Sequence, residues 1–209
     1  MKPDAAPRER ILQHAIELFA TLGFEATTMR RLGEAVGLDN SSLYRHFRSK
    51  AALADAVLDH VAAELVARVA DRIQPSRPVT LQALEDVCAT AGLYFFDQPA
   101  AARLMVHWLM STGVDGPGLA VSIPATDVSR PGGALVAMLS AWLGAGVRGG
   151  VLRQHAMPEA VVILLGATLI RPATRGYLLA SLEPKRTPAA ARAAWEGELR
   201  ATVRGAFAP

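Results

Sequence analysis

A short run of hydrogen-bonding side chains is the part of this 209-residue chain best suited to chemistry. Leu43 and Phe47 are four residues apart, so they share one face of a helix and leave the opposite face to polar residues. Polar side chains on so short a helix are typical of a surface that enters the major groove of DNA. The polar set is Asn40, Ser41, Tyr44, Arg45 and His46.

Positive charge is concentrated around the same run. Residues 27–50 contain five Lys or Arg and two Asp or Glu, and this balance of +3 equals the formal charge of the whole chain. A local excess of this kind is placed where DNA phosphates would lie. The alternative is an ordinary solvated helical hairpin, since many helix pairs have similar charge and spacing.

Two helices joined by a tight turn must position these side chains. Apolar residues recur at helical spacing from Met29 to Val36, which predicts the first helix. Thr28 is a suitable N-cap for it, and Gly37 is predicted to end it because glycine adopts positive φ without strain. Asp39 is predicted to cap the second helix, where its charge also suits the helix dipole.

From Arg10 to Val57 the sequence resembles the N-terminal domain of the TetR (tetracycline-repressor-like) family of bacterial regulators. The segment LYRHF, followed by Lys50 and then Leu53, is the most specific part of the match. Gly33 departs from the family pattern, because Ala is usual there and Gly costs about 1 kcal/mol of helix propensity. Asp39 stands where Ser is commoner. The other matching residues are Ile11, Ala15, Leu18, Phe19, Gly23, Phe24, Thr27, Thr28, Leu32, Ala35 and Gly37.

The resemblance implies a homodimeric transcriptional regulator, a repressor that binds a palindromic operator in double-stranded DNA and is released by a small-molecule effector. The residues that it places at base edges are Arg30, Asn40, Ser41, Arg45 and His46. Those that it places at phosphates are Thr28, Ser42, Tyr44 and Lys50. The alternative is a helical, dimeric ligand-binding protein without sequence-specific DNA binding.

The fold predicted for the whole chain is all-α. A helix-turn-helix DNA-binding domain occupies residues 1–52, and a helical ligand-binding and dimerisation domain occupies residues 53–209. A hydrophobic content of 51% is enough for a sizeable core. Residues 112–133 form a long loop, either a pocket lid or a disordered segment. Helices are predicted over Pro7–Leu22, Ser49–Ile73, Thr80–Asp97, Ala100–Ser111, Ala134–Val147, Pro158–Leu182 with a kink at Pro172, and Pro188–Phe207.

Helices of the second domain line the ligand pocket in the resembling family. An apolar lining with few polar groups suits a medium-sized hydrophobic or aromatic molecule. His107 is either a ligand contact or a core histidine. Arg171 either faces an anionic ligand group or pairs with a carboxylate across the dimer. The residues predicted for this pocket are Phe95, His107, Trp108, Ser111, Trp142 and Arg171.

The last two long helices predict an interface between two copies of the chain. An Ala-rich final helix beside one that is apolar on all sides leaves more apolar surface than one chain covers. A second copy packed as a four-helix interface would cover it, and burial within the monomer is the alternative. The residues predicted for this interface are Val161, Leu165, Trp195, Leu199 and Val203.

The sequence argues against an enzyme. Its five histidines are scattered, no helix carries paired carboxylates or a His-x-x-x-His pair, and a Gly-rich phosphate loop is missing. We therefore expect no catalytic residue, metal site or cofactor. Cys88 is the single cysteine, which excludes an internal disulfide and fits a small core residue. The apolar run Ala160–Ile170 is too short to cross a bilayer and the start lacks an apolar signal core, so a cytoplasmic protein without a membrane partner is expected.

Overall fold

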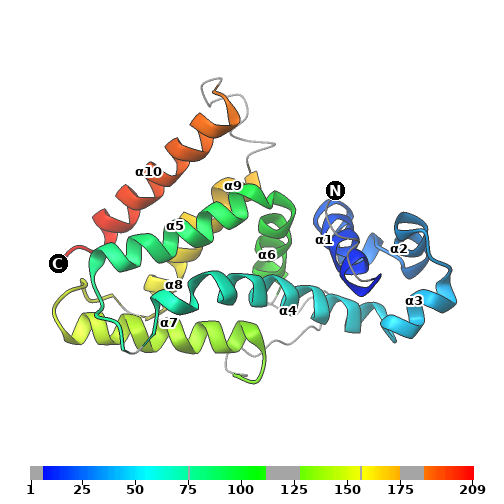
Figure 1. Cartoon of the computed structure of the whole chain (residues 1–209), viewed down its shortest axis with the longest axis horizontal. Helices are drawn as coiled ribbons and strands as arrows, with labels where there is room; N and C mark the ends of the chain where they lie inside the picture. Colours follow the sequence, from blue (N-terminus) through cyan, green and yellow to red (C-terminus); the bar gives the residue numbers. More distant parts are fainter. Residues whose placement is uncertain (1–6, 75, 112–127, 156, 175–185) are drawn as a thin grey trace.

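The computed structural model describes residues 7–74, 76–111, 128–155, 157–174 and 186–209. All regular secondary structure in these ranges is helical, which confirms the predicted fold class (Figure 1). Three helices form a head at one end of the molecule. They are α1 (Pro7–Ala26), α2 (Met29–Val36) and α3 (Asn40–His46).

One long helix, α4 (Lys50–Val69), connects the head to the rest of the chain (Figure 1). Ser49 caps it, since the Ser49 hydroxyl accepts a hydrogen bond from the Ala52 N–H at 3.0 Å. A short 3-10 turn, η1 (Ala70–Arg72), follows α4, so the helical stretch ends close to the predicted Ile73. The apolar core of the head continues along α4 into α5 and α6 without a break. The predicted domain division at residue 52 therefore falls inside α4 and crosses one continuous core.

The remaining helices, called the body here, include α5 and α7, which both pack against α4. Figure 1 shows α7 alongside α4, and α10 against α5 at the far end from the head. A second apolar cluster joins α5, α7 and α10, and it includes Trp142, Trp195 and Leu199. The body helices are α5 (Leu81–Asp97), α6 (Pro99–Ser111), α7 (Pro131–Arg148), α8 (Met157–Leu165), η2 (Gly166–Ile170), α9 (Arg171–Thr174) and α10 (Pro188–Phe207).

Some details of the helices differ from the prediction. Helix α1 passes beyond Leu22, with a kink at Gly23, whose φ of 80° only glycine adopts readily. Helix α7 begins at Pro131, three residues before the predicted start, because proline is favoured in the first helical turn. Pro172 follows a π-helical segment, since a proline cannot donate to the carbonyl one turn earlier. Residues 112–127 of the predicted loop and 175–182 of the predicted helix lie outside the described residues.

Gly33 permits a close approach between α2 and the carbonyl group of Leu38, which the sequence did not indicate. A Cβ atom at this position would lie 2.7 Å from the carbonyl oxygen of Leu38, in the turn between α2 and α3. The same turn is closed by a hydrogen bond from the Leu38 N–H to the Gly33 carbonyl at 2.9 Å. The glycine therefore lowers helix propensity but allows the turn that sets the angle of α3.

We expect Gly33→Ala to destabilise the protein, although alanine gains about 1 kcal/mol in helix propensity. A backbone carbonyl cannot move aside as a side chain can, so the turn must shift. The control is Gly144→Ala in α7, where a Cβ would meet, among the described residues, only the flexible end of Arg148 at 3.2 Å. Urea denaturation should show a loss for the first variant and a gain for the second. Equal gains in both would contradict the steric role of Gly33.

Candidate nucleic-acid interface

The turn between α2 and α3 has the predicted capping pattern. The Thr28 hydroxyl accepts from the Arg31 N–H at 3.1 Å and so caps α2. Gly37 ends α2 with a φ of 75°, in the left-handed region. Asp39 caps α3 by accepting from the Ser42 N–H at 2.7 Å. Local side-chain chemistry therefore fixes both ends of the turn that presents α3.

The Asp39 carboxylate organises the first residues of α3. It accepts hydrogen bonds from the Ser41 hydroxyl at 2.6 Å and from the Ser42 hydroxyl at 3.0 Å. The Ser42 oxygen in turn accepts from the Arg45 guanidinium at 2.7 Å. Hydrogen bonds from the Ser41 hydroxyl, and then from the N–H and hydroxyl of Ser42, lower the pKa of Asp39 to about 2. The group is thus a carboxylate throughout the neutral range.

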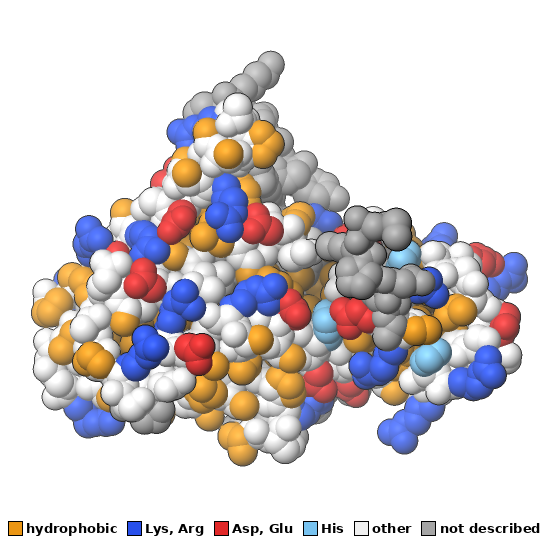
Figure 2. All heavy atoms as spheres, viewed as in Figure 1, with side chains coloured by type: hydrophobic (Ala, Val, Ile, Leu, Met, Phe, Trp, Pro, Cys, Tyr) orange, Lys and Arg blue, Asp and Glu red, His pale blue; other side chains and the backbone are white. Residues whose placement is uncertain are grey.

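The residues predicted at base edges are exposed. On α3 these are Asn40, Ser41, Arg45 and His46. Arg30 on α2 is also exposed, and its Nε donates to Glu34 one turn later at 2.9 Å. Figure 2 shows Lys and Arg side chains along the outer edge of the head. An exposed surface of donors and acceptors beside positive charge is the chemistry that a DNA groove requires.

The residues predicted at phosphates have unequal surroundings. Thr28 is exposed, and 50% of Tyr44 is exposed. Lys50 instead holds the end of α1, because its ammonium donates to the carbonyls of Phe24 at 2.9 Å and Glu25 at 3.2 Å. The same ammonium lies 4.2 Å from the centre of the Phe24 ring. A phosphate contact from Lys50 would share an ammonium that already has partners.

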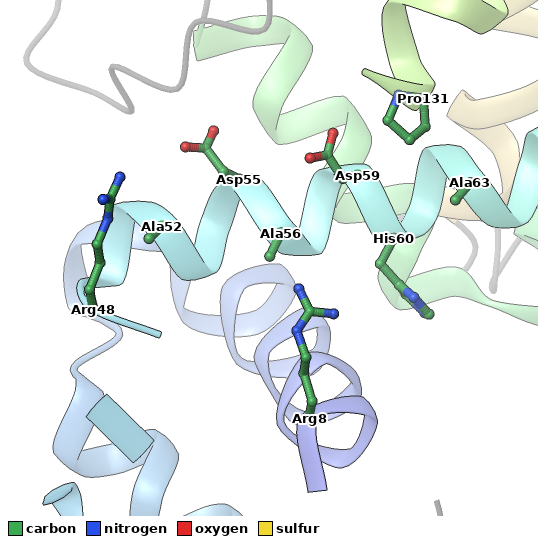
Figure 3. A pocket seen from close by; sticks show the side chains of 9 residues that line it. All are labelled: Arg8, Arg48, Ala52, Asp55, Ala56, Asp59, His60, Ala63 and Pro131. Carbon is green, nitrogen blue, oxygen red and sulfur yellow. The ribbon is translucent and has the colours of Figure 1, made fainter. Parts of the chain in front are cut away.

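Two arginines beside the head were not among the predicted site residues. Arg8 of α1 and Arg48, just before α4, line the head end of an open groove of about 510 Å³ (Figure 3). The Arg8 guanidinium lies 5.2 Å from the centre of the Phe47 ring, which places it close to the end of α3. Arg48 contributes to the local charge excess in the sequence, but Arg8 comes near α3 only through the packing of α1.

The opposite wall of this groove is acidic and joins α4 to α7. Arg130, just before α7, donates to Asp59 at 3.1 Å and to Asp55 at 3.4 Å. Figure 3 shows both carboxylates on the side of α4 away from Arg8 and His60. His60 faces α1, where its Nε2 lies 3.2 Å from Gln13 and 3.4 Å from Glu9. The first half of α4 is therefore fixed by contacts with Arg130 on one side and by contacts with α1 of the head on the other.

The predicted ligand residues do not converge on one pocket. His107 and Trp108 line a cavity of about 30 Å³ between α1, α4 and α6, together with Phe19, Phe24 and Leu58 among others. That volume holds about two water molecules, far less than a medium-sized ligand. His107 is exposed, so it is not a core histidine.

The remaining predicted ligand residues lie elsewhere. Phe95 and Trp142 are buried in different apolar clusters. Arg171 pairs with Glu198 of its own chain and lies 5.0 Å from the Trp195 ring centre, so its carboxylate partner is intramolecular in this structure. The side chain of Ser111 lies outside the described residues. Cys88 is buried as predicted, and this burial raises the pKa of its thiol to about 12.

The predicted dimer interface needs a correction. Trp195, Leu199 and Val203 are at most 5% exposed within a single chain, because α5 covers them. The Trp195 Nε1 donates to the carbonyl of Gly92 at 3.3 Å, and a Cβ on Gly92 would lie 2.3 Å from Leu199. These three side chains therefore form part of the core of a single chain, whereas the prediction placed them between two copies. Leu165 is half-buried, and the side chain of Val161 lies outside the described residues.

A helix-turn-helix head on a long connecting helix and a helical body is an arrangement typical of DNA-binding regulatory proteins. Residues 11–57 match the family model described as bacterial regulatory proteins, tetR family. The matched residues lie within the segment whose sequence resembles that family, so the comparison confirms the resemblance for the head. None of the described helices has both the length and the apolar character needed to cross a membrane.

Individual relatives agree with this assignment. The chain is 40% identical over 63 residues to the HTH-type transcriptional repressor KstR2 of Mycolicibacterium smegmatis, a match of 28% of this chain and 31% of that protein. It is 42% identical over 52 residues to the class C tetracycline repressor protein of Escherichia coli, covering 25% of this chain and 24% of that protein. The matches therefore span about a third or less of these relatives.

Solved structures extend the likeness to the whole fold. The ketosteroid transcriptional regulator KstR2 of Mycobacterium tuberculosis matches with a TM-score of 0.69 over 99% of this chain and 97% of that one, at 20% identity. The regulator PfmR of Thermus thermophilus matches with a TM-score of 0.65 over 96% of this chain and 97% of that one, at 23% identity. At these identities the likeness concerns the fold alone.

Proposed function

We propose that this protein is a sequence-specific DNA-binding transcriptional regulator, a repressor that a small molecule releases from its operator. The observation that carries the proposal is the exposed, Asp39-organised face of α3, presented by a capped tight turn at the end of the molecule. The names of the two curated relatives, both repressors, support it. Its site of action is then the cytoplasm of a bacterium.

In this proposal α3 enters the major groove and positive residues around it contact the backbone. Arg45 and His46 face base edges, as do Asn40 and Ser41. The Thr28 hydroxyl accepts from the α2 backbone, which leaves its proton free to be donated to a phosphate. Arg8 and Arg48 add phosphate contacts beside α3. A gel shift with the DNA flanking its own gene, scanned for an inverted repeat, tests the proposal, and absence of a specific shift would count against it.

Lys50→Ala is expected to weaken binding to all DNA sequences alike and to flatten the salt dependence by about one charge. It should also lower thermal stability, because the carbonyls of Phe24 and Glu25 lose a charged donor. Arg48→Ala is the matched control, since it should flatten the salt slope without loss of stability. Salt titrations of DNA affinity and thermal melts measure both effects. Relaxed sequence preference with an unchanged slope in Lys50→Ala would overturn the phosphate role.

Dimerisation is part of the proposal, on a face of α10 different from the one predicted. Opposite the buried side of α10 lies a stripe of small residues that are exposed or half-buried. A Cβ on Gly197 or Gly205 would meet no atom of the described residues within 4 Å, so the described part of the chain leaves this stripe open. Small side chains allow two helices to approach closely, which suits a second copy of α10. The stripe consists of Ala190, Ala194, Gly197, Ala201 and Gly205.

The proposed effector acts through α4. A repressor of this kind needs its two reading helices about 34–36 Å apart to reach successive major grooves. The seam between head and body, where His107 and Trp108 meet α1 and α4, would open if a hydrophobic or aromatic molecule entered it. Such a ligand would favour a conformation in which α4 tilts and the spacing is lost.

A thermal-shift screen of apolar and aromatic compounds, followed by competition with operator DNA, tests this part of the proposal. Compounds that raise the melting temperature should release DNA. If stabilising compounds never change operator affinity, the mechanism fails, because a ligand that binds both states equally shifts neither.

A further inference from the structure

At the start of α3, the hydroxyl groups of two serines donate their hydrogen bonds to one carboxylate. The Ser41 and Ser42 hydroxyls both lie within hydrogen-bond distance of the Asp39 carboxylate, at 2.6 Å and 3.0 Å. An ionised carboxylate carries no proton, so it can only accept. Both hydroxyl protons are therefore directed at Asp39, and the two serine oxygens present lone pairs to their remaining neighbours.

Those lone pairs have different surroundings. Ser42 is half-buried, and its oxygen accepts from the Arg45 guanidinium at 2.7 Å. Ser41 is exposed, so its oxygen offers lone pairs to solvent beside the exposed carboxylate. Arg45 has five N–H donors, and within the described part of the chain its side chain donates to Ser42 alone, which leaves donors for a base.

This arrangement selects among the groups that DNA presents. A phosphate oxygen is a negatively charged acceptor, so it cannot pair with Ser41 or Ser42 and is repelled by Asp39. The exocyclic amino groups of adenine and cytosine are the donors in the major groove, and carboxylates accept from cytosine in known pairings. An Arg such as Arg45 pairs with the two acceptors of guanine.

We infer that Asp39 and Ser41 form an acceptor-only reader of an adenine or cytosine amino group, and that Ser42 is a positioning residue for Arg45 rather than a phosphate contact. The inference rests on the proposed function. Ser41 and Arg45 are four residues apart, so their Cβ atoms lie about 5–6 Å from one another on the helix. Bases on one strand rise about 3.4 Å per step. The operator half-site therefore holds A or C within two steps of a guanine.

Selection from random duplex DNA tests the inference with the full-length protein and three variants. Wild type should enrich a motif with a position where A or C exceeds G or T by about tenfold, beside a guanine position. Ser41→Ala should reduce that preference to under about twofold and keep the guanine, since Ser42 and Arg45 are untouched. Asp39→Asn keeps a good N-cap but frees a hydroxyl proton, so both positions should weaken.

Ser140→Ala, a serine of α7 far along the chain from the head, is the matched control and should leave the motif unchanged. A Ser41→Ala motif identical to that of wild type overturns the inference, as does a wild-type motif without A or C near the guanine. If wild type enriches no motif, the proposed function itself is overturned. Should Asp39→Asn fail to fold by circular dichroism, Ser41→Ala decides alone, because its hydroxyl takes no part in the backbone cap.

Discussion

Replacing Leu199 with Glu is expected to unfold the body of the protein rather than to separate two subunits. Leu199 is 1% exposed and packs against α5, where the missing side chain of Gly92 makes room for it. An unpaired carboxylate buried there would cost several kcal/mol, a large part of the stability of a domain. Leu199→Ala should cost about 2–5 kcal/mol, since it leaves a cavity.

Leu199 belongs either to the core of a single chain or to a dimer interface. Urea denaturation combined with sedimentation separates these two interpretations. Thr202→Glu, an exposed substitution on the same helix, is the control and should change stability by less than about 0.5 kcal/mol. A Leu199→Glu protein that sediments as a folded monomer with unchanged stability would place this residue at a dimer interface. That result would contradict the packing of α10 on α5.

Replacing Ala201 with Arg is expected to give a folded monomer with very weak operator binding. Ala201 lies on the small-residue stripe of α10, opposite the buried Leu199 and Val203. A long charged side chain there would keep two copies of α10 apart without disturbing the monomer core. Loss of the second half-site contact should lower operator affinity by about 10²–10⁴-fold.

Ala141→Arg on α7 makes the same change at another exposed alanine of the body, so it controls for added charge and bulk. Analytical ultracentrifugation and DNA titration should show a dimer with intact binding for this control. A dimeric Ala201→Arg protein that binds operator normally would exclude the stripe as the interface.

Local chemistry made much of the fold predictable. Five of the predicted helices are capped by the side chain of the residue just before them. These caps are Thr28, Asp39, Ser49, Thr80 and Thr187. A cap involves a side chain and a backbone N–H a few residues away, so the sequence contains the whole interaction. The family motif from Arg10 to Val57 could be recognised for the same reason, because its residues are close in sequence.

Contacts between distant segments were not predictable in this way. The large residues Trp195 and Leu199 mark an apolar face of α10, but periodicity does not say whether α5 or a second chain covers it. Lys50 reaches the carbonyls of Phe24 and Glu25 only because α1 ends beside the start of α4. Arg171 finds Glu198 across 27 positions of the chain. Each of these partners is set by tertiary packing.

Selection from random duplex DNA, followed by affinity measurements at one salt concentration, tests sequence-specific binding most directly. The account predicts an inverted repeat whose half-site centres lie about 10–10.5 base pairs, or a multiple of that, apart. It also predicts binding to this repeat at least about 10³-fold tighter than to a shuffled duplex. Equal affinity for the selected and shuffled duplexes would contradict it.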